Sequence, residues 1–114
     1  MQLRTANCPK ATTIGNSAFY CCYSLNEAWF SAATVIKSNA FYRCLTLKSL
    51  YLLGSSVCAL SNSSAFFSTP IAGYSGSAGT YGNIYVPPSL VTSYQTATNW
   101  TYFSSRIVGL TVIS

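Results

Sequence analysis

The sequence predicts a β-rich repeat solenoid of short parallel strands, followed by a C-terminal strand–helix–strand cap. Three observations predict it: a motif that recurs at a fixed period, an apolar alternation inside each copy, and a tail that leaves the repeat pattern. The chain has 114 residues and half of them are hydrophobic. That size and composition suit one compact domain with an apolar core.

The repeated motif stands in two neighbouring stretches. Residues 14–22 read IGNSAFYCC, and residues 36–44 read IKSNAFYRC, 22 positions later. A second apolar pattern follows each copy, LNEAWF at 25–30 and LKSLYL at 47–52. A fixed period of this size is typical of stacked-repeat proteins.

Each copy predicts one coil with two inward-facing walls. The L-x-x-L-x-L pattern indicates a short strand whose marked residues point inward, and Val35–Ile36 with Ala40–Phe41 indicates the opposite wall. One copy cannot bury these faces alone, so we expect the copies to stack at about 4.8 Å. The predicted repeat core consists of Ile14, Phe19, Cys22, Leu25, Ile36, Phe41, Cys44, Leu47 and Phe66.

The period also sets the expected boundaries. We place a solenoid at residues 1–72, with repeats at 3–24, 25–46 and 47–71. The third repeat departs from the motif, as a terminal repeat that meets solvent is expected to do. We expect it to keep its register at Val57–Cys58 and to carry about three extra residues between Cys58 and Ala65.

The remaining residues predict a Gly/Ser-rich connector at 73–82 and a cap at 83–114. Residues 83–86 indicate a strand, and Pro87–Pro88 indicate the start of a short helix, since Pro fits a first turn. A final strand is expected at 106–113. The residues expected on one face of the short helix are Leu90, Val91, Tyr94, Ala97 and Thr98. Trp100 and Phe103 are expected to pack over the last coil.

The pattern Ile-Gly-x-x-Ala-Phe-x-x-Cys-x-x-Leu, at residues 14–25 and with Lys37 in place of Gly at 36–47, resembles the BspA-like leucine-rich repeats. The tail, from Ile84-Tyr85-Val86-Pro87 through Thr98-Asn99-Trp100 to Ile107, resembles the cap that often ends such arrays in gut-bacterial and phage-associated proteins. The resemblance implies a leucine-rich-repeat-like solenoid used for adhesion or ligand display. It implies an extracellular place, at a cell surface or on a virion, and it names no ligand.

The composition argues against catalysis and metal binding. The chain has no His, no Asp and a single Glu, so Ser-His-Asp triads, carboxylate pairs and carboxylate-rich cation sites are excluded. The spacing of the five cysteines includes no C-x-x-C motif, which argues against a zinc-binding site. We therefore expect no enzyme activity, no catalytic residue, no cofactor and no metal.

The cysteines instead fit the repeat. Four of them fall in apolar columns and are expected to be buried: Cys8, Cys22, Cys44 and Cys58. Cys58 is taken as equivalent to Ile36. Only Cys21, which is equivalent to Arg43, is expected to face outward.

The net charge of +5 reflects missing acids, because the basic residues never form a run. Nucleic-acid binding is therefore not expected. No apolar stretch approaches the ~20 residues that a membrane span needs, so membrane insertion is not expected either. The first residues also lack the apolar run of a signal peptide.

The outward columns of the predicted strands are the candidate binding surface. Trp29 is expected above Tyr51, beside Asn26, Lys48 and Asn7. Such a surface suits a glycan or protein ligand, because aromatic rings give contact area and amides give adaptable hydrogen bonds. Alternatively, the rings serve only as cross-strand pairs. The latter interpretation is favoured for a second aromatic column, which consists of Tyr20, Tyr42 and Phe67.

Two functions remain open. The first is a recognition or adhesion module that uses these columns. The second is a structural assembly module of a fibre, tail or filament, because the strand that starts at Leu3 would leave an unpaired apolar edge. That edge would take up further repeats or another copy of the chain.

Overall fold

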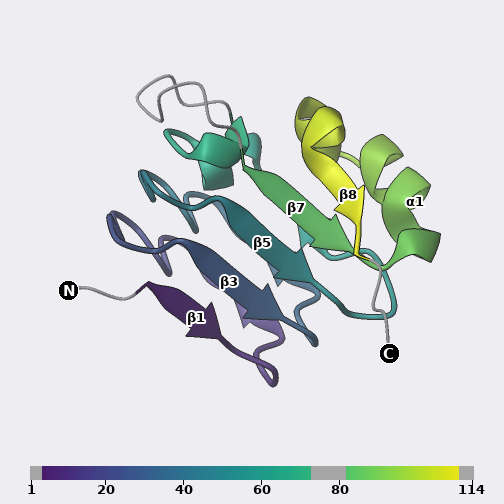
Figure 1. The fold of residues 1–114 in the computed structure, drawn as a ribbon, viewed down its shortest axis with the longest axis horizontal. Helices are drawn as coiled ribbons and strands as arrows, with labels where there is room; N and C mark the ends of the chain where they lie inside the picture. The colour runs from purple at the N-terminus through teal and green to yellow at the C-terminus, as the bar shows by residue number, and fades with distance from the viewer. Residues whose placement is uncertain (1–3, 73–81, 111–114) are drawn as a thin grey trace.

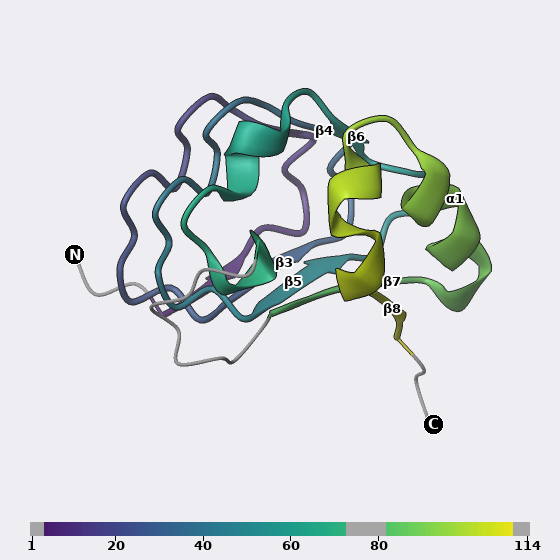
Figure 2. The same ribbon diagram turned by 90° about the horizontal axis from the view of Figure 1, so that it is seen from above.

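The computed structural model describes residues 4–72 and 82–110 as two parallel sheets that face each other across an apolar core (Figures 1 and 2). The larger sheet has the strand order β1-β3-β5-β7-β8 and the smaller one has the order β2-β4-β6. The strands of the larger sheet are β1 (Thr5–Asn7), β3 (Glu27–Phe30), β5 (Ser49–Leu52), β7 (Asn83–Val86) and β8 (Ile107–Gly109). Those of the smaller sheet are β2 (Thr13–Ile14), β4 (Val35–Ile36) and β6 (Ala59–Leu60).

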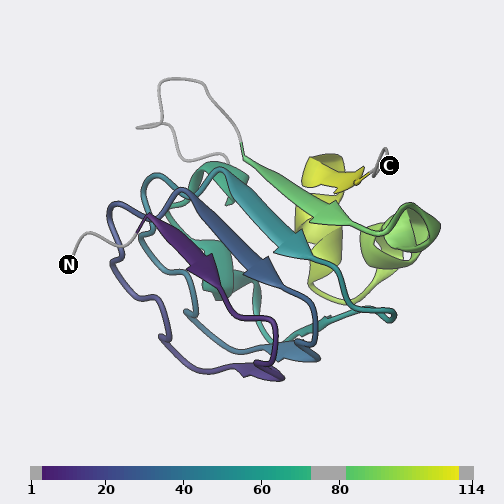
Figure 3. The same cartoon turned by 60° about the horizontal axis from the view of Figure 1, so that its bottom comes forward.

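The 22-residue period is the register of the first three strands of the larger sheet, β1, β3 and β5. Thr5 pairs with Glu27, and Glu27 pairs with Ser49. Side chains alternate along each strand, so Ala28 and Phe30 are buried while Trp29 between them is half-buried. The inward and outward faces predicted for the first strands are confirmed. Figure 3 shows the successive coils, each lying beside the next from β1 to β7.

A third wall, made of turns, joins the two sheets on the side away from α1 (Val91–Thr96; Figure 2). Cys21, Arg43 and Ser68 occupy the same position in the three coils, and each has left-handed backbone, with φ of 58°, 61° and 60°. Backbone bonds run from coil to coil here, including Phe19 N to Ala40 O at 2.7 Å and Phe41 N to Ala65 O at 2.8 Å. The turns therefore stack as regularly as the strands.

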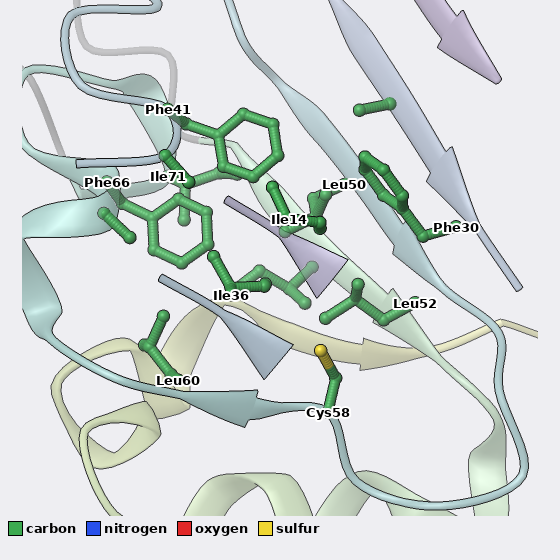
Figure 4. Packing of buried hydrophobic residues seen from close by; sticks show 14 of the residues in the cluster. Ile14, Phe30, Ile36, Phe41, Leu50, Leu52, Cys58, Leu60, Phe66 and Ile71 are labelled. Carbon is green, nitrogen blue, oxygen red and sulfur yellow. The ribbon is translucent and has the colours of Figure 1, made fainter. Parts of the chain in front are cut away.

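The core fills the space between the three walls (Figure 4). Leu50, Leu52 and Phe30 reach it from the larger sheet, and Ile14, Ile36 and Leu60 reach it from the smaller one. The turn wall contributes a stack of phenylalanines, in which Phe41 lies 5.2 Å from Phe19 and 5.6 Å from Phe66 between ring centroids. Burying one such side chain contributes about 1.5–3 kcal/mol to the free energy of unfolding.

Three members of the expected apolar columns are only partly buried, which corrects the sequence interpretation. Cys8, Phe19 and Cys22 are half-buried, whereas Cys44 and Cys58 are buried. The three belong to the first coil, and within the described residues that coil is stacked on one side only. Cys21 has the same intermediate exposure, so it is not set apart from Cys22 as the sequence suggested.

The expected register of the third coil is wrong. Ile36 pairs with Leu60, so Leu60 and not Cys58 takes the place of Ile14 and Ile36. Two extra residues therefore precede β6, and one more lies between Leu60 and Ala65. The third coil continues with the 3-10 helices η1 (Ser63–Phe66) and η2 (Pro70–Ala72).

The C-terminal elements agree in part with expectation. β7 pairs with β5 and continues the repeat sheet, after which come the 3-10 helix η4 (Pro88–Leu90), α1 and the 3-10 helix η5 (Trp100–Arg106). Tyr94 is buried, but Thr98 is exposed because Ala97 leaves the helix with extended backbone. The final strand, β8, begins after Arg106, while residues 111–113 and most of the proposed connector (73–81) lie outside the described residues.

Side chains of the C-terminal segment bind the backbone beside β6, the edge of the smaller sheet. The hydroxyl of Tyr94 accepts from Cys58 N–H at 2.8 Å, and Trp100 Nε1 donates to Cys58 O at 2.7 Å. Asn99 Nδ2 donates to Leu60 O, also at 2.7 Å. These side chains pair with backbone groups at the edge of the smaller sheet, as a further strand would otherwise do.

Candidate recognition surface

The sheet register brings the predicted aromatic pair together on the outer face of the larger sheet. Trp29 and Tyr51 are register partners, and their rings stack with centroids 3.6 Å apart and planes 6° from parallel. Asn7 is the register partner of Trp29 in β1 and is exposed. These three residues therefore form the column that the sequence predicted.

Sequence reasoning missed the continuation of this column. Tyr85 in β7 is the register partner of Tyr51, and its ring stacks at 4.8 Å and 15°. Val108 in β8 follows and is exposed. The motif NIYV at 83–86 matches SLYL at 49–52 in type, but the offset is 34 residues instead of 22, which hides the match from a search at the repeat period.

Asn26 and Lys48 are exposed but stand apart from the rings. They precede β3 and β5 and form a column of their own, in which Lys48 N bonds Asn26 O at 2.9 Å. Three residues of extended chain separate Asn26 from Trp29, which is roughly 10 Å. The surface is thus a strip with a polar end, at Asn26 and Lys48, and an aromatic middle, at Trp29 and Tyr51.

The ring arrangement limits what the surface can hold. Stacked rings cover each other's faces, so the middle of the column presents ring edges to solvent. The outer face of Trp29, on the side of Asn7, is an end of the stack. Ring edges carry the indole N–H and the phenol hydroxyls, which suit hydrogen bonding and edge contacts with a protein surface.

The chain's single acid lies on the same face. Glu27 is half-buried in β3, and Thr5 Oγ1 donates to its Oε1 at 3.4 Å. Arg4 and Lys48 are exposed before β1 and β5. The strip therefore carries mixed charge along one side and neutral rings along the other.

The buried thiols are not nucleophiles. Burial raises the pKa of Cys44 and of Cys58 to about 12, so both are protonated at neutral pH. No group of three or more His, Cys, Asp or Glu side chains gathers to hold a metal within residues 4–72 and 82–110, and no pocket opens there. None of the helices in that part of the chain is long and apolar enough to cross a bilayer.

Parallel strands stacked at the repeat period define the chain as a repeat protein of the solenoid type. A sequence model described as the BspA type leucine-rich repeat region (6 copies) matches residues 1–75 of the 114. The chain belongs to this family. No curated protein and no solved structure matches it.

Membership in this family indicates the general kind of function. Repeats of this type commonly serve in adhesion or protein interaction, are generally non-catalytic, and typically occur in surface or extracellular proteins.

Proposed function

We propose that this chain is a non-catalytic recognition module that binds its ligand on the outer face of the larger sheet, at a bacterial surface or on a phage virion. The observation that supports the proposal best is the continuous stack of Trp29, Tyr51 and Tyr85 across three strands. Its rings are half-buried, so they are held in place and still reach solvent. Rigid aromatic side chains of this kind lose little entropy on binding.

Of the two ligand classes that suit such a face, the geometry favours a protein. A sugar packs best on an open ring face, and only the outer faces of Trp29, toward Asn7, and of Tyr85, toward Val108, lie at the ends of the stack. A protein can use the whole row of ring edges together with the exposed amides of Asn7 and Asn26. A glycan ligand would be confined to the two ends of the stack, beside Asn7 or beside Val108.

The test compares wild type with Trp29→Ala and Tyr51→Ala on a glycan array and on peptides selected from a random displayed library. Each variant should lower affinity for the selected ligand by about tenfold or more, as removal of a central aromatic commonly does. Circular dichroism should show that the sheets persist. Binding that survives both changes would place the ligand elsewhere.

Tyr102→Ala is the matched control, because Tyr102 is 74 % exposed and lies in η5, away from the strip. It removes a tyrosine without touching the stack, so it should bind like wild type. Glycan hits lost in Trp29→Ala but kept in Tyr51→Ala would identify the Asn7 end as the site and a glycan as the ligand.

A second candidate, assembly through β1, also has structural support. β1 pairs only with β3 among the described residues, and half-buried Cys8, Phe19 and Cys22 belong to the same end of the stack. Further repeats or a second copy of the chain could pair there. Light scattering over a concentration series tests this candidate: a defined oligomer supports assembly, and a stable monomer contradicts self-association.

A further inference from the structure

The turn wall carries a second aromatic surface, distinct from the strip on the sheet. It consists of Tyr20, Tyr23, Tyr42, Arg43 and Phe67, here called the turn surface. Tyr20, Tyr23 and Phe67 are 51 %, 49 % and 50 % exposed, which makes them more open to solvent than the half-buried rings of the sheet. Most of the large, exposed hydrophobic side chains of the described residues gather here, and such patches mark interaction sites.

The backbone holds this surface in a fixed shape. Each of the three rings in its column directly precedes a left-handed residue, at Cys21, Arg43 and Ser68, so the three turns present their side chains in the same way. Cys21 N bonds Tyr42 O at 2.8 Å, and Arg43 N bonds Phe67 O at 2.9 Å. A partner would therefore meet a surface that needs little ordering on binding.

The side chains lie close to one another across coils. Tyr20 and Tyr42 stack with centroids 5.2 Å apart, and Phe67 lies 6.4 Å from Tyr42 with its plane tilted by 52°. A hydrogen bond with Cys21 is the main cause that raises the pKa of Tyr23, and the nearby positive charge of Arg43 opposes it. Arg43 directly follows Tyr42, is exposed, and its backbone N–H donates to Phe67 O, so the surface carries a cation among its rings.

No acid in the sequence offsets that cation. The single Glu27 belongs to the sheet face, where Thr5 donates to it. A second copy of the chain would place Arg43 against another basic surface, since each copy carries +5, and like charges repel. Nucleic acid is disfavoured because affinity for phosphates needs several cations in a row.

We propose that the turn surface is a second recognition site, which binds an acidic protein segment. Apolar side chains of the segment pack over Tyr20 and Phe67, and a carboxylate pairs with Arg43. The site is independent of the strip on the sheet, so the chain would engage two surfaces at once.

The test uses a random peptide library displayed on phage, selected on wild type and counter-selected on Tyr20→Ser/Phe67→Ser. The recovered peptides should be rich in Asp and Glu. They should bind the double variant about tenfold more weakly, as loss of anchor residues predicts, and bind Trp29→Ala like wild type. Peptides without acidic enrichment, or no peptide that depends on Tyr20 and Phe67, would overturn the proposal.

Charge is tested separately with Arg43→Asn, since Asn tolerates the left-handed backbone of this position. The acidic peptides should bind it more weakly, and the affinity of wild type should fall as salt is added. Lys10→Asn is the control, because Lys10 is exposed and precedes β2 in the first coil. Lys10→Asn should leave the affinity for the acidic peptides unchanged. If it lowered the affinity as much as Arg43→Asn does, the effect would come from net charge and not from a contact with Arg43.

Two further probes distinguish other occupants. Phosphatidylserine vesicles or a single-stranded oligonucleotide that bind wild type but not Tyr20→Ser/Phe67→Ser would overturn the acidic peptide in favour of a lipid surface or a nucleic acid. Trp29→Ala leaves the turn surface intact. Binding that depends on Tyr20 and Phe67 therefore tests the turn surface, and binding that depends on Trp29 tests the strip on the sheet.

Discussion

Replacing Tyr94 with Phe tests whether the C-terminal segment stabilises the edge of the smaller sheet through its hydrogen bonds. Tyr94 is fully buried, and its hydroxyl accepts from Cys58 N–H at 2.8 Å. Phe keeps the ring and its edge contact with Trp100, at 5.3 Å between centroids. The substitution therefore removes the acceptor and leaves the packing unchanged.

The expected loss follows from the buried N–H that remains without its partner. Leaving such a group unpaired costs about 1–3 kcal/mol of the free energy of unfolding. With a urea m value of about 2 kcal/mol/M, the unfolding midpoint should fall by roughly 0.5–1.5 M. Urea titrations followed by circular dichroism measure both quantities.

Tyr102→Phe is the matched control, since Tyr102 is 74 % exposed and loses the same hydroxyl. It should change stability by less than about 0.5 kcal/mol. If Tyr94→Phe were as stable as this control, the bond to Cys58 would not stabilise the junction. Tyr94→Phe/Trp100→Phe should also lose less than the sum of the single variants, because both side chains bind the Cys58 backbone.

Two other predictions concern the buried thiols of Cys44 and Cys58 and the tight packing around Gly82. Burial raises the folded pKa of Cys44 and Cys58 from 9.0 to about 12, so the folded state holds these protons more tightly than the unfolded state. The contribution of these two thiols to the free energy of unfolding should be fully present below pH 9. It should be lost between pH 9 and 12, by about 1.4 kcal/mol per thiol per pH unit. Cys44→Ala/Cys58→Ala should show a shallower slope in urea titrations at several pH values, and an equal slope would contradict the assignment. Gly82→Ala places a Cβ 3.0 Å from Lys48 O and should cost about 1–3 kcal/mol in thermal unfolding, whereas Gly15→Ala meets nothing within 4 Å and should be nearly neutral. Equal effects of the two alanines would contradict the packing at Gly82.

The first two coils were predictable because stacked parallel strands turn the sequence period directly into a register. Residues 22 apart, such as Trp29 and Tyr51, must then lie side by side. The third coil was not predictable by the same arithmetic. At that coil Tyr94 and Trp100 bind the Cys58 backbone from 36 and 42 positions away. Two extra residues precede β6, and the repeat period does not show on which side of Cys58 they fall.

The same physics explains which part of the candidate sites the sequence could predict. Periodicity assigns side chains to columns, and the rings of Trp29 and Tyr51 stack as expected. Periodicity does not tell which columns remain open to solvent. The sequence favours a packing role for the column of Tyr20, Tyr42 and Phe67, yet its two ends are about half exposed, more than any ring on the sheet. The middle ring of such a column can therefore stabilise the stacked coils while the rings at its ends remain open to solvent. Packing and recognition are thus compatible roles for one column.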